Sequence, residues 1–389
     1  MLRFMTAGES HGPALTAIIE GLPAGVIVDR EQINADLARR QQGFGRGGRM
    51  LIEKDKAEVL SGIRFGQTLG SPVTLMITNR DWENWQERMS QFGNPSGAAV
   101  TAPRPGHADL PGILKYNRED VRDILERASA RETAARVAGG AVCKQLLAAV
   151  GIRIGSHVVN IGGVNAEVRP KNYEDVIDKC AKSELGCLDE VAEGKMKAAI
   201  LQAKDQGDSL GGVFEVVVYG AMPGLGSHIQ WDRRLDTKLA GAFMSIQAVK
   251  GVEIGAGFNC ANLPGSQIHD EIYYDSSRGY YRQTNNAGGI EGGITNGEPI
   301  IIRAAMKPIP TLMKPLASVD IASQTPIKAN TERSDVCAVT AAAVVGEAMM
   351  AIVLAEVLLD KFGRDNMAEI TQRVTQYREA VKSVIQVNG

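Results

Sequence analysis

Residues 10–25, SHGPALTAIIEGLPAG, combine a glycine turn, an apolar strand and a Gly-Leu-Pro turn, and a helical pattern at residues 32–40 follows them. A similar series stands at residues 209–224, SLGGVFEVVVYGAMPG, before a helical pattern at residues 233–243. Two copies of one strand–turn–helix unit would explain the likeness, and a chance match of two short stretches would explain it too. A duplication predicts one intertwined α+β domain with antiparallel strands, not two separate domains.

Apolar periodicity predicts the regular elements. Strands are expected at residues 15–19, 73–77, 213–219 and 300–304, and helices at residues 32–40, 119–149, 173–204, 233–243 and 336–361. The helix at 173–204 is rich in Lys, Glu and Asp, which indicates a solvated surface. The last helix is closed by Gly363. Glu347 and Glu356 interrupt its apolar run, so we expect a long buried helix and not a membrane span.

The composition is that of a folded, soluble protein, with 389 residues of which 44% are hydrophobic and 23% charged. With 43 Lys and Arg against 45 Asp and Glu, the net charge of −2 disfavours a nucleic-acid binder, so any anion site must be a local cluster. The N-terminus lacks the apolar segment of a signal peptide. Five scattered cysteines without a C-x-x-C pair predict reduced thiols in a cytoplasmic protein, and no metal-site spacing is found.

The first segment that could carry chemistry is residues 38–50, ARRQQGFGRGGRM, which holds Arg39, Arg40, Arg46 and Arg49. Its glycines match G-x-G-x-x-G, but a helical pattern precedes them where a dinucleotide site needs a strand. The basic patch is also too brief for an RNA-binding RGG segment. Guanidinium forks on a glycine loop suit carboxylate or phosphate groups, and a merely solvated basic loop is the alternative.

Two histidines lie on glycine turns. In residues 104–109, RPGHAD, a rigid turn presents His107 beside Arg104 and Asp109, which favours a general acid–base role. His11 follows Ser10, but adjacent side chains point apart and no oriented acid partner is evident, so a serine hydrolase is disfavoured. The pair fits proton transfer without covalent catalysis.

Three further segments complete the candidate site. Residues 126–133, ERASARET, place Arg127 and Arg131 on one helix face, where Glu126 and Glu132 could simply pair with them. Residues 285–296, NNAGGIEGGITN, and the later run MKPIPT allow close approach to a flat ligand or a phosphate. Ser334 or Asp335 could cap the last helix. Together the segments indicate an enzyme for a small polyanionic substrate, with proton transfer and a flat phosphate-bearing cofactor, and they leave the reaction open.

In their order along the chain, these segments resemble the motifs of the chorismate synthase family. The matching stretches are GESHGPALTAIIEGLPAG, RRQQGFGRGGRM, RPGHADLPGILKY, RASARETAARVA, SIQAVKGVEIGAGF, NNAGGIEGGITNG, MKPIPT and ERSDVCAV. The resemblance implies a β-α-β sandwich with internal repetition. It implies one domain over residues 1–389, with pseudo-repeats at about 1–150 and 205–335 and a long C-terminal helix. It further implies assembly as a homotetramer.

The resemblance also implies a reaction. The family converts 5-enolpyruvylshikimate 3-phosphate (EPSP) to chorismate and phosphate by anti-1,4-elimination, and it needs reduced FMN without net redox change. NADP is a further expected association. No extra segment suggests the self-reducing fungal type, so we expect a monofunctional enzyme supplied with reduced flavin by an external flavin reductase.

Site residues are carried over motif by motif. His11 would protonate the departing phosphate, His107 would protonate the reduced flavin or hold its anionic form, and Asp335 would help relay the proton lost from the ring carbon. Substrate binding is implied for Ser10, Arg40, Arg46, Arg49 and Arg131, and FMN binding for Arg127, Ala128, Ser129, Gln247, Ala248, Gly292, Lys307, Pro308, Ile309, Pro310, Thr311 and Arg333.

Two other functions compete with this one. A flavin-dependent oxidoreductase on the same scaffold would consume NAD(P)H stoichiometrically with product. A non-enzymatic anion- or RNA-binding protein built on the Arg/Gly loop would bind in a salt-sensitive way and tolerate substitution of His11 and His107.

Overall fold

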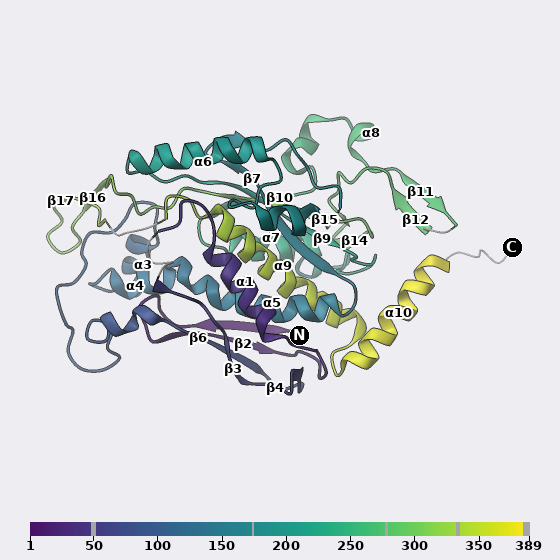
Figure 1. Ribbon diagram of the computed structural model, residues 1–389, viewed down its shortest axis with the longest axis horizontal. Coiled ribbons are helices and arrows are strands. Elements are labelled where there is room, and N and C mark those ends of the chain that lie inside the picture. The colour runs from purple at the N-terminus through teal and green to yellow at the C-terminus, as the bar shows by residue number, and fades with distance from the viewer. Residues whose placement is uncertain (48–51, 173–174, 277–278, 332–334, 384–389) are drawn as a thin grey trace.

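Two antiparallel sheets enclose a layer of helices in the computed structural model, which describes residues 1–47, 52–172, 175–276, 279–331 and 335–383 (Figure 1). The first sheet has the order β1 (Arg3–Ala7), β2 (Ala14–Glu20), β6 (Val73–Thr78) and β3 (Glu58–Ser61). The second has the order β8 (Val164–Asn165), β7 (Arg153–Ile161), β9 (Gly212–Tyr219), β15 (Ile300–Met306) and β10 (Val249–Ile254).

Four helices form the middle layer, namely α1 (Arg30–Gln41), α5 (Thr133–Ala148), α7 (Leu235–Met244) and α9 (Val339–Phe362). Helix α5 packs on β2 and β6, α9 packs on β7 and β9, and the two helices pack on each other. The apolar faces of both sheets are therefore buried against helices in one continuous core. This arrangement confirms the predicted α+β class and the β-α-β sandwich.

The two sheets are connected in the same way. With the two-residue strand β8, the two-stranded sheets and the helices outside the middle layer left aside, the chain runs β1, β2, α1, β3, β6, α5 and then β7, β9, α7, β10, β15, α9. Of the four strands counted in this way in each sheet, the fourth inserts between the second and the third. The internal duplication stays a prediction, and this shared order of elements supports it. A second repeat defined by the shared order would run from β7 to α9, and so would extend beyond the predicted residues 205–335 at both ends.

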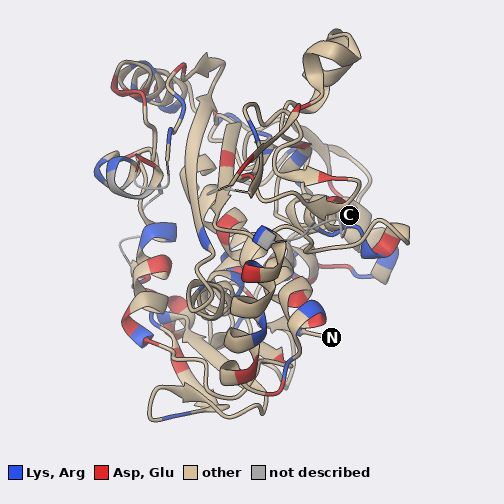
Figure 2. Ribbon diagram, turned by 90° about the vertical axis from the view of Figure 1, so that its right-hand side faces the viewer, with Lys and Arg blue, Asp and Glu red and all other residues tan. Residues whose placement is uncertain are grey.

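The remaining elements lie at the edges of the sandwich. They are β4 (Ile63–Arg64), β5 (Gln67–Thr68), η1 (Arg80–Asn84), α3 (Asp109–Tyr116), α4 (Arg122–Ala128), η2 (Ala130–Glu132), η3 (Asp175–Lys179), η4 (Cys180–Lys182), α6 (Glu190–Asp205), η5 (Trp231–Arg233), η6 (Gly257–Asn262), α8 (Gly265–Ile268), β11 (Ile272–Asp275), β12 (Gly279–Arg282), β13 (Ile290–Glu291), β14 (Ile294–Thr295), β16 (Ala317–Val319), β17 (Pro326–Lys328) and α10 (Met367–Ser383). Lys and Arg alternate with Asp and Glu over the elements in Figure 2.

Most predicted elements are found close to their expected bounds, and two predictions are wrong. The expected helix at 119–149 is broken at Ser129, whose extended backbone separates α4 from η2 and α5. Residues 173–204 were expected to form one helix, but the regular α-helix α6 begins only at Glu190, after its N-cap residue Asp189. Strands β1, β3, β7 and β10 were not expected from the sequence.

Helix α9 is the core element that resembles a membrane span. Among the described residues it alone is long and apolar enough to cross a membrane, and 83% of its most apolar window is buried inside the protein. Glu347, at its centre, is fully buried and accepts hydrogen bonds from Arg39, Lys144 and Ser156, each at 2.6 Å at the closest. The prediction of a long buried helix is confirmed, and Gly363 ends it as expected.

Candidate active site

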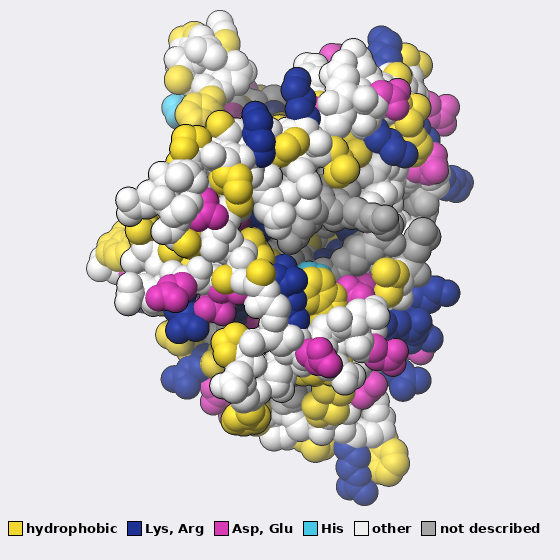
Figure 3. Space-filling model, turned by 90° about the vertical axis from the view of Figure 1, so that its left-hand side faces the viewer, with side chains coloured by type: hydrophobic (Ala, Val, Ile, Leu, Met, Phe, Trp, Pro, Cys, Tyr) yellow, Lys and Arg dark blue, Asp and Glu magenta, His cyan; other side chains and the backbone are white. Residues whose placement is uncertain are grey.

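A cavity of about 400 Å³ opens where the end of α1 and the starts of α5 and α9 meet the His107 turn and the loop after β15. This volume is within the range of small-molecule sites. Figure 3 shows a hollow on this face, with histidine and Lys or Arg side chains at its edge.

Two buried arginines meet on one carboxylate. Arg131 Nη1 lies 2.6 Å from Asp55 Oδ1, and Arg40 Nη1 lies 3.4 Å from Asp55 Oδ2. Arg40 also donates to Thr133 Oγ1 at 2.9 Å. Burial lowers the pKa of Arg40 to about 10; Asp55 opposes this, and the neighbouring Arg131 adds to it. Arg40 therefore remains cationic at neutral pH, where it can attract an anion.

A third arginine, Arg46, is held by Asp335, which lies four residues before the start of α9. Arg46 Nη1 lies 2.9 Å from Asp335 Oδ2, and Gly47 N donates to Asp335 Oδ1 at 2.6 Å. Asp335 therefore holds Arg46 and Gly47 of the Arg/Gly loop at the cavity. The prediction that it caps the last helix is wrong, because α9 begins at Val339 after Ala338, without a side-chain cap. Ser334, the other predicted cap, lies outside the described residues.

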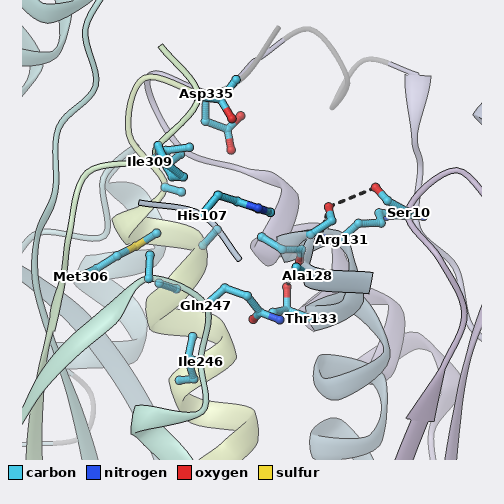
Figure 4. A pocket seen from close by; sticks show the side chains of 18 of the residues that line it. Ser10, His107, Ala128, Arg131, Thr133, Ile246, Gln247, Met306, Ile309 and Asp335 are labelled. Atoms are coloured by element: carbon cyan, nitrogen blue, oxygen red, sulfur yellow. Dashed lines mark hydrogen bonds between the residues drawn. The ribbon is translucent and has the colours of Figure 1, made fainter. Parts of the chain in front are cut away.

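His107 is clamped by its neighbours in the turn. Its Nδ1 forms a very short hydrogen bond to Asp109 Oδ1, and Arg104 Nε donates to Asp109 Oδ2 at 2.8 Å. Burial would raise the pKa of Asp109, but the hydrogen bonds from His107 and Arg104 hold it well below its usual range. Figure 4 shows His107 reaching into the cavity between Asp335 and Gln247. The expected grouping of His107 with Arg104 and Asp109 is therefore present.

His11 has the acid partner that the sequence did not reveal. Its Nδ1 lies 3.0 Å from Glu126 Oε1, and Ser10 Oγ lies 3.1 Å from Ser129 Oγ (Figure 4). The expectation that His11 has no oriented acid was wrong, because Glu126 on α4 reaches it across the fold. The hydroxyl of Ser10 is directed to Ser129, so Ser10 and His11 do not form a nucleophile–base pair.

The opposite wall is apolar. Ile246, Met306, Ile309 and Val345 line it together with Ala338, Ala341 and Ala342 of the α9 end. Gln247 Nε2 donates to Glu132 Oε2 at 3.1 Å, while its buried Oε1 has no hydrogen-bond partner among the described residues. Ala248 has φ of 68°, a strained backbone for a residue with a Cβ. Such a wall suits a flat ring that can donate one hydrogen bond.

The structure brings most of the expected site residues into this one cavity. They are Ser10, His11, Arg40, Arg46, His107, Ala128, Ser129, Arg131, Gln247, Ala248, Lys307, Ile309, Pro310, Thr311 and Asp335. Arg49 and Arg333 lie outside the described residues. Pro308 is not among the residues that line the cavity.

Arg127 and Gly292 do not line the cavity either. Arg127 Nη2 donates to Thr6 O at 2.8 Å and Nη1 to Gly8 O at 3.1 Å, so its guanidinium is directed to β1 and the turn after it. Gly292 follows β13, near the ends of β10 and β15 that lie away from Gln247 and Lys307. Six strand residues at about 3.3 Å each separate those ends by roughly 20 Å.

Sequence reasoning missed the residues that hold the site in place. Asp55, Glu126 and Thr133 contact groups far away in the sequence, and no local pattern signals such partners. The alternative that Glu126 and Glu132 simply pair with Arg127 and Arg131 is met only by Glu132, which lies 3.8 Å from Arg127 and 2.8 Å from Arg136. Glu126 pairs instead with Arg122 at 2.6 Å and with His11. Arg104 was noted only as a neighbour of His107.

A pocket that combines guanidinium groups with two histidine–carboxylate pairs is typical of an enzyme that moves protons on a small anionic substrate. A model of the chorismate synthase family matches residues 2–359. The chain belongs to the chorismate synthase family. It is therefore an enzyme, a lyase of aromatic biosynthesis, and acts on a small-molecule substrate.

Individual relatives agree over the whole chain. The chorismate synthase of Geobacter metallireducens is 60% identical over 392 residues, covering 98% of this chain and all of the relative. That of Aquifex aeolicus is 58% identical over 392 residues, covering 98% of each chain. A crystal structure of a chorismate synthase, 49% identical, superposes with a TM-score of 0.79 over 98% of each chain.

Proposed function

We propose that this cavity catalyses the anti-1,4-elimination of phosphate from EPSP, giving chorismate, with reduced FMN present and not consumed. The observation that carries the proposal is the gathering of His11, His107, Arg40, Arg46 and Arg131 around one cavity. EPSP carries a phosphate and two carboxylates. A single charge pair at contact is worth roughly 4 kcal/mol before desolvation at an effective dielectric near 20, so several cations are needed.

In the proposed reaction, Arg40, Arg46 and Arg131 bind the anionic groups of the substrate, and Arg49, close to Arg46 in sequence, is a further candidate. Ser10 contributes a hydroxyl beside them. His11 donates its proton to the departing phosphate as the C–O bond breaks. Asp335, close to Arg46, accepts and passes on the proton lost from the ring carbon. Each step moves a proton between groups of this chain and the substrate without a covalent enzyme intermediate.

The cavity fits a flavin. Its apolar wall suits the ring, and the buried, unpaired Oε1 of Gln247 can accept from a ring N–H. Ala128, Ser129, Gln247, Ala248, Lys307, Ile309, Pro310 and Thr311 would hold the cofactor. FMN contacts from Arg127, Pro308, Gly292 and Arg333 stay predictions of the family resemblance.

When bound, reduced FMN would supply electron density that assists C–O cleavage, without net redox change. His107 would supply a proton to the reduced flavin or stabilise its anionic form; its imidazole is held by Asp109, which Arg104 binds in turn.

Three broader features belong to the same proposal. An external flavin reductase supplies the reduced cofactor, the chains assemble as a homotetramer, and NADP is associated with the flavin supply. The compartment is the cytoplasm, which agrees with five free cysteines, four of them buried.

The test is anaerobic mixing of the protein with EPSP and dithionite-reduced FMN, following chorismate absorbance and phosphate release. Release of both products with the flavin still reduced is expected. Stoichiometric oxidation of NAD(P)H with product would instead indicate the oxidoreductase. No product from folded protein would remove the proposed reaction.

A further inference from the structure

Glu126 contacts His11 at two places. Its carboxylate oxygens both lie 3.0 Å from His11 Nδ1, and Oε2 also accepts the backbone N–H of His11 at 2.8 Å. The backbone carbonyl of Glu126 accepts the N–H of Ser10 at 3.0 Å. One residue of α4 therefore fixes both the backbone and the ring of the turn that carries His11.

Other groups enclose the same ring. The ring of Trp85 lies against the imidazole, tilted by 30° with 4.1 Å between ring centroids, and Asp81 Oδ2 lies 4.0 Å from His11 Nε2. Arg122 binds Glu126 Oε1 at 2.6 Å and places its guanidinium 4.7 Å from the centroid of Trp85. The imidazole thus lies between stacking and hydrogen-bonding partners, with little freedom to turn.

The chemistry of a carboxylate decides which ring nitrogen carries a proton. An ionised carboxylate only accepts hydrogen bonds, so a short contact to Nδ1 requires Nδ1–H. Burial would raise the pKa of Glu126, yet the hydrogen bond from His11 and the charge of Arg122 lower it, so it is ionised at neutral pH. The proton that His11 exchanges then belongs to Nε2. His107 and Asp109 show the same arrangement on the second histidine.

We propose that Glu126 is the positioning residue of His11: its buried carboxylate fixes the Nδ1–H tautomer and the ring orientation, and so reserves Nε2 for proton exchange with the departing phosphate. The part that concerns phosphate rests on the proposed function. When Nε2 gives up its proton, Nδ1–H stays bonded to Glu126, and the product imidazole is neutral and correctly oriented for reprotonation.

The first test needs no variant and no ligand. Nitrogen-15 NMR of the full chain, at a pH where the imidazoles are neutral, reports the tautomer of each of the five histidines. The His11 signals are assigned by their loss in His11→Gln. We expect the Nδ1–H tautomer for His11. The Nε2–H tautomer, which predominates for a histidine side chain free in water, would overturn the proposal.

The second test separates positioning from a merely structural role. We expect Glu126→Gln to lower kcat about 10²-fold with little change in KM, because a misplaced acid impairs the chemical step more than binding. In the His11→Ala background the same change should cost less than about threefold, because Glu126 acts through the ring. Asp123→Asn, on the exposed side of α4, is the matched control and should leave both constants unchanged.

The outcomes are distinct. Equal losses from Glu126→Gln with and without His11 would overturn the proposal, and so would wild-type kcat in the single variant. If Glu126→Gln does not fold, Glu126→Asp keeps the carboxylate and should keep the Nδ1–H tautomer in the NMR experiment. A wild-type protein without activity toward EPSP would refute the proposed function, whereas the tautomer result would stand independently of it.

Discussion

Arg131 and Asp55 form a fully buried ion pair of 2.6 Å at the wall of the active-site cavity. The second oxygen of Asp55 faces Arg40, so one anion holds two guanidiniums that would otherwise repel each other. Glu53 Oε2 lies 3.5 Å from Arg131 on the same side. In the proposed function this wall is an anion receptor, and its geometry depends on the carboxylates that hold the two arginines.

Asp55→Asn is expected to weaken substrate binding more than catalysis. The amide keeps the shape but leaves two buried cations without their shared anion, so they shift apart or lose their fixed orientation. We expect KM for EPSP to rise about 10- to 100-fold and the protein to lose roughly 3–5 kcal/mol of stability. Steady-state kinetics below the unfolding temperature of the variant measure this. Glu58→Gln, an exposed carboxylate on β3, is the control; an unchanged KM in Asp55→Asn would contradict the receptor.

Arg46→Ala should affect the binding of EPSP and of reduced FMN to different extents. Arg46 pairs with Asp335 on the Arg/Gly loop, and the apolar wall with Gln247 lies elsewhere in the cavity. We therefore expect the Kd for EPSP to increase more than the Kd for reduced FMN, which anaerobic calorimetry can measure for each ligand alone. Equal losses for both would show that Arg46 is not a substrate ligand.

His11→Ala and His107→Ala should each lower kcat by about 10²- to 10⁴-fold, the usual range for a general acid–base group. Both side chains are held by buried carboxylates, so each substitution removes a fixed proton carrier. Anaerobic chorismate formation measures kcat. His269→Ala, well outside the cavity, is the control, and wild-type rates in either active-site variant would exclude the proton-transfer role.

Much of the fold follows from local pattern. Strands β2, β6, β9 and β15 and helices α1, α7 and α9 carry continuous apolar runs or faces, and each was expected near its observed bounds. Strand β7 was missed because Gly155, Ser156 and His157 interrupt its apolar pattern. Ser156 and His157 are buried with Glu347 and Glu215 as partners, and those partners come from other elements.

The sequence indicated the histidines and arginines of the candidate site, but not the residues that hold them in place. Histidines on glycine turns and arginines on a glycine loop are visible in the sequence because their local setting is unusual. Asp55 and Glu126 occupy ordinary settings, and their roles arise only when distant segments meet. The break at Ser129 illustrates the same limit: its extended backbone directs the hydroxyl toward Ser10, which helical periodicity cannot reveal.

Replacing glycine by alanine is expected to have opposite effects on stability at the contact of α5 with α9 and on the surface helix α6. A Cβ on Gly140 of α5 would lie 2.4 Å from the Cβ of Ala348 on α9, whereas a Cβ on Gly194 of α6 would meet nothing within 4 Å. We expect Gly140→Ala to destabilise the protein by about 1–3 kcal/mol through overpacking. Gly194→Ala should stabilise it by about 0.5–1 kcal/mol through helix propensity. Urea unfolding measures both, and a stabilised Gly140→Ala would contradict the observed helix packing.

The buried carboxylate of Glu347 should make the stability of the protein depend on pH in the acid range. Burial would raise its pKa, but the charges of Arg39 and Lys144 lower it far below the usual range. A carboxyl with a lowered folded pKa contributes stability above its unfolded pKa of about 4.3, and that contribution is lost as the pH falls toward the folded pKa. Glu347→Gln should therefore cost roughly 3–5 kcal/mol at pH 7, and the gap to wild type should narrow below about pH 4.

Urea unfolding at pH 7 and pH 3 measures this gap. Glu356→Gln is the matched control on the same helix, because Glu356 pairs with Lys238 at 3.0 Å in a partly exposed position. Its cost should stay below about 1 kcal/mol at both pH values, since solvent screens the pair. A Glu347→Gln gap that is the same at both pH values, or no larger than that of Glu356→Gln, would mean that the buried cluster does not hold Glu347 ionised in the core.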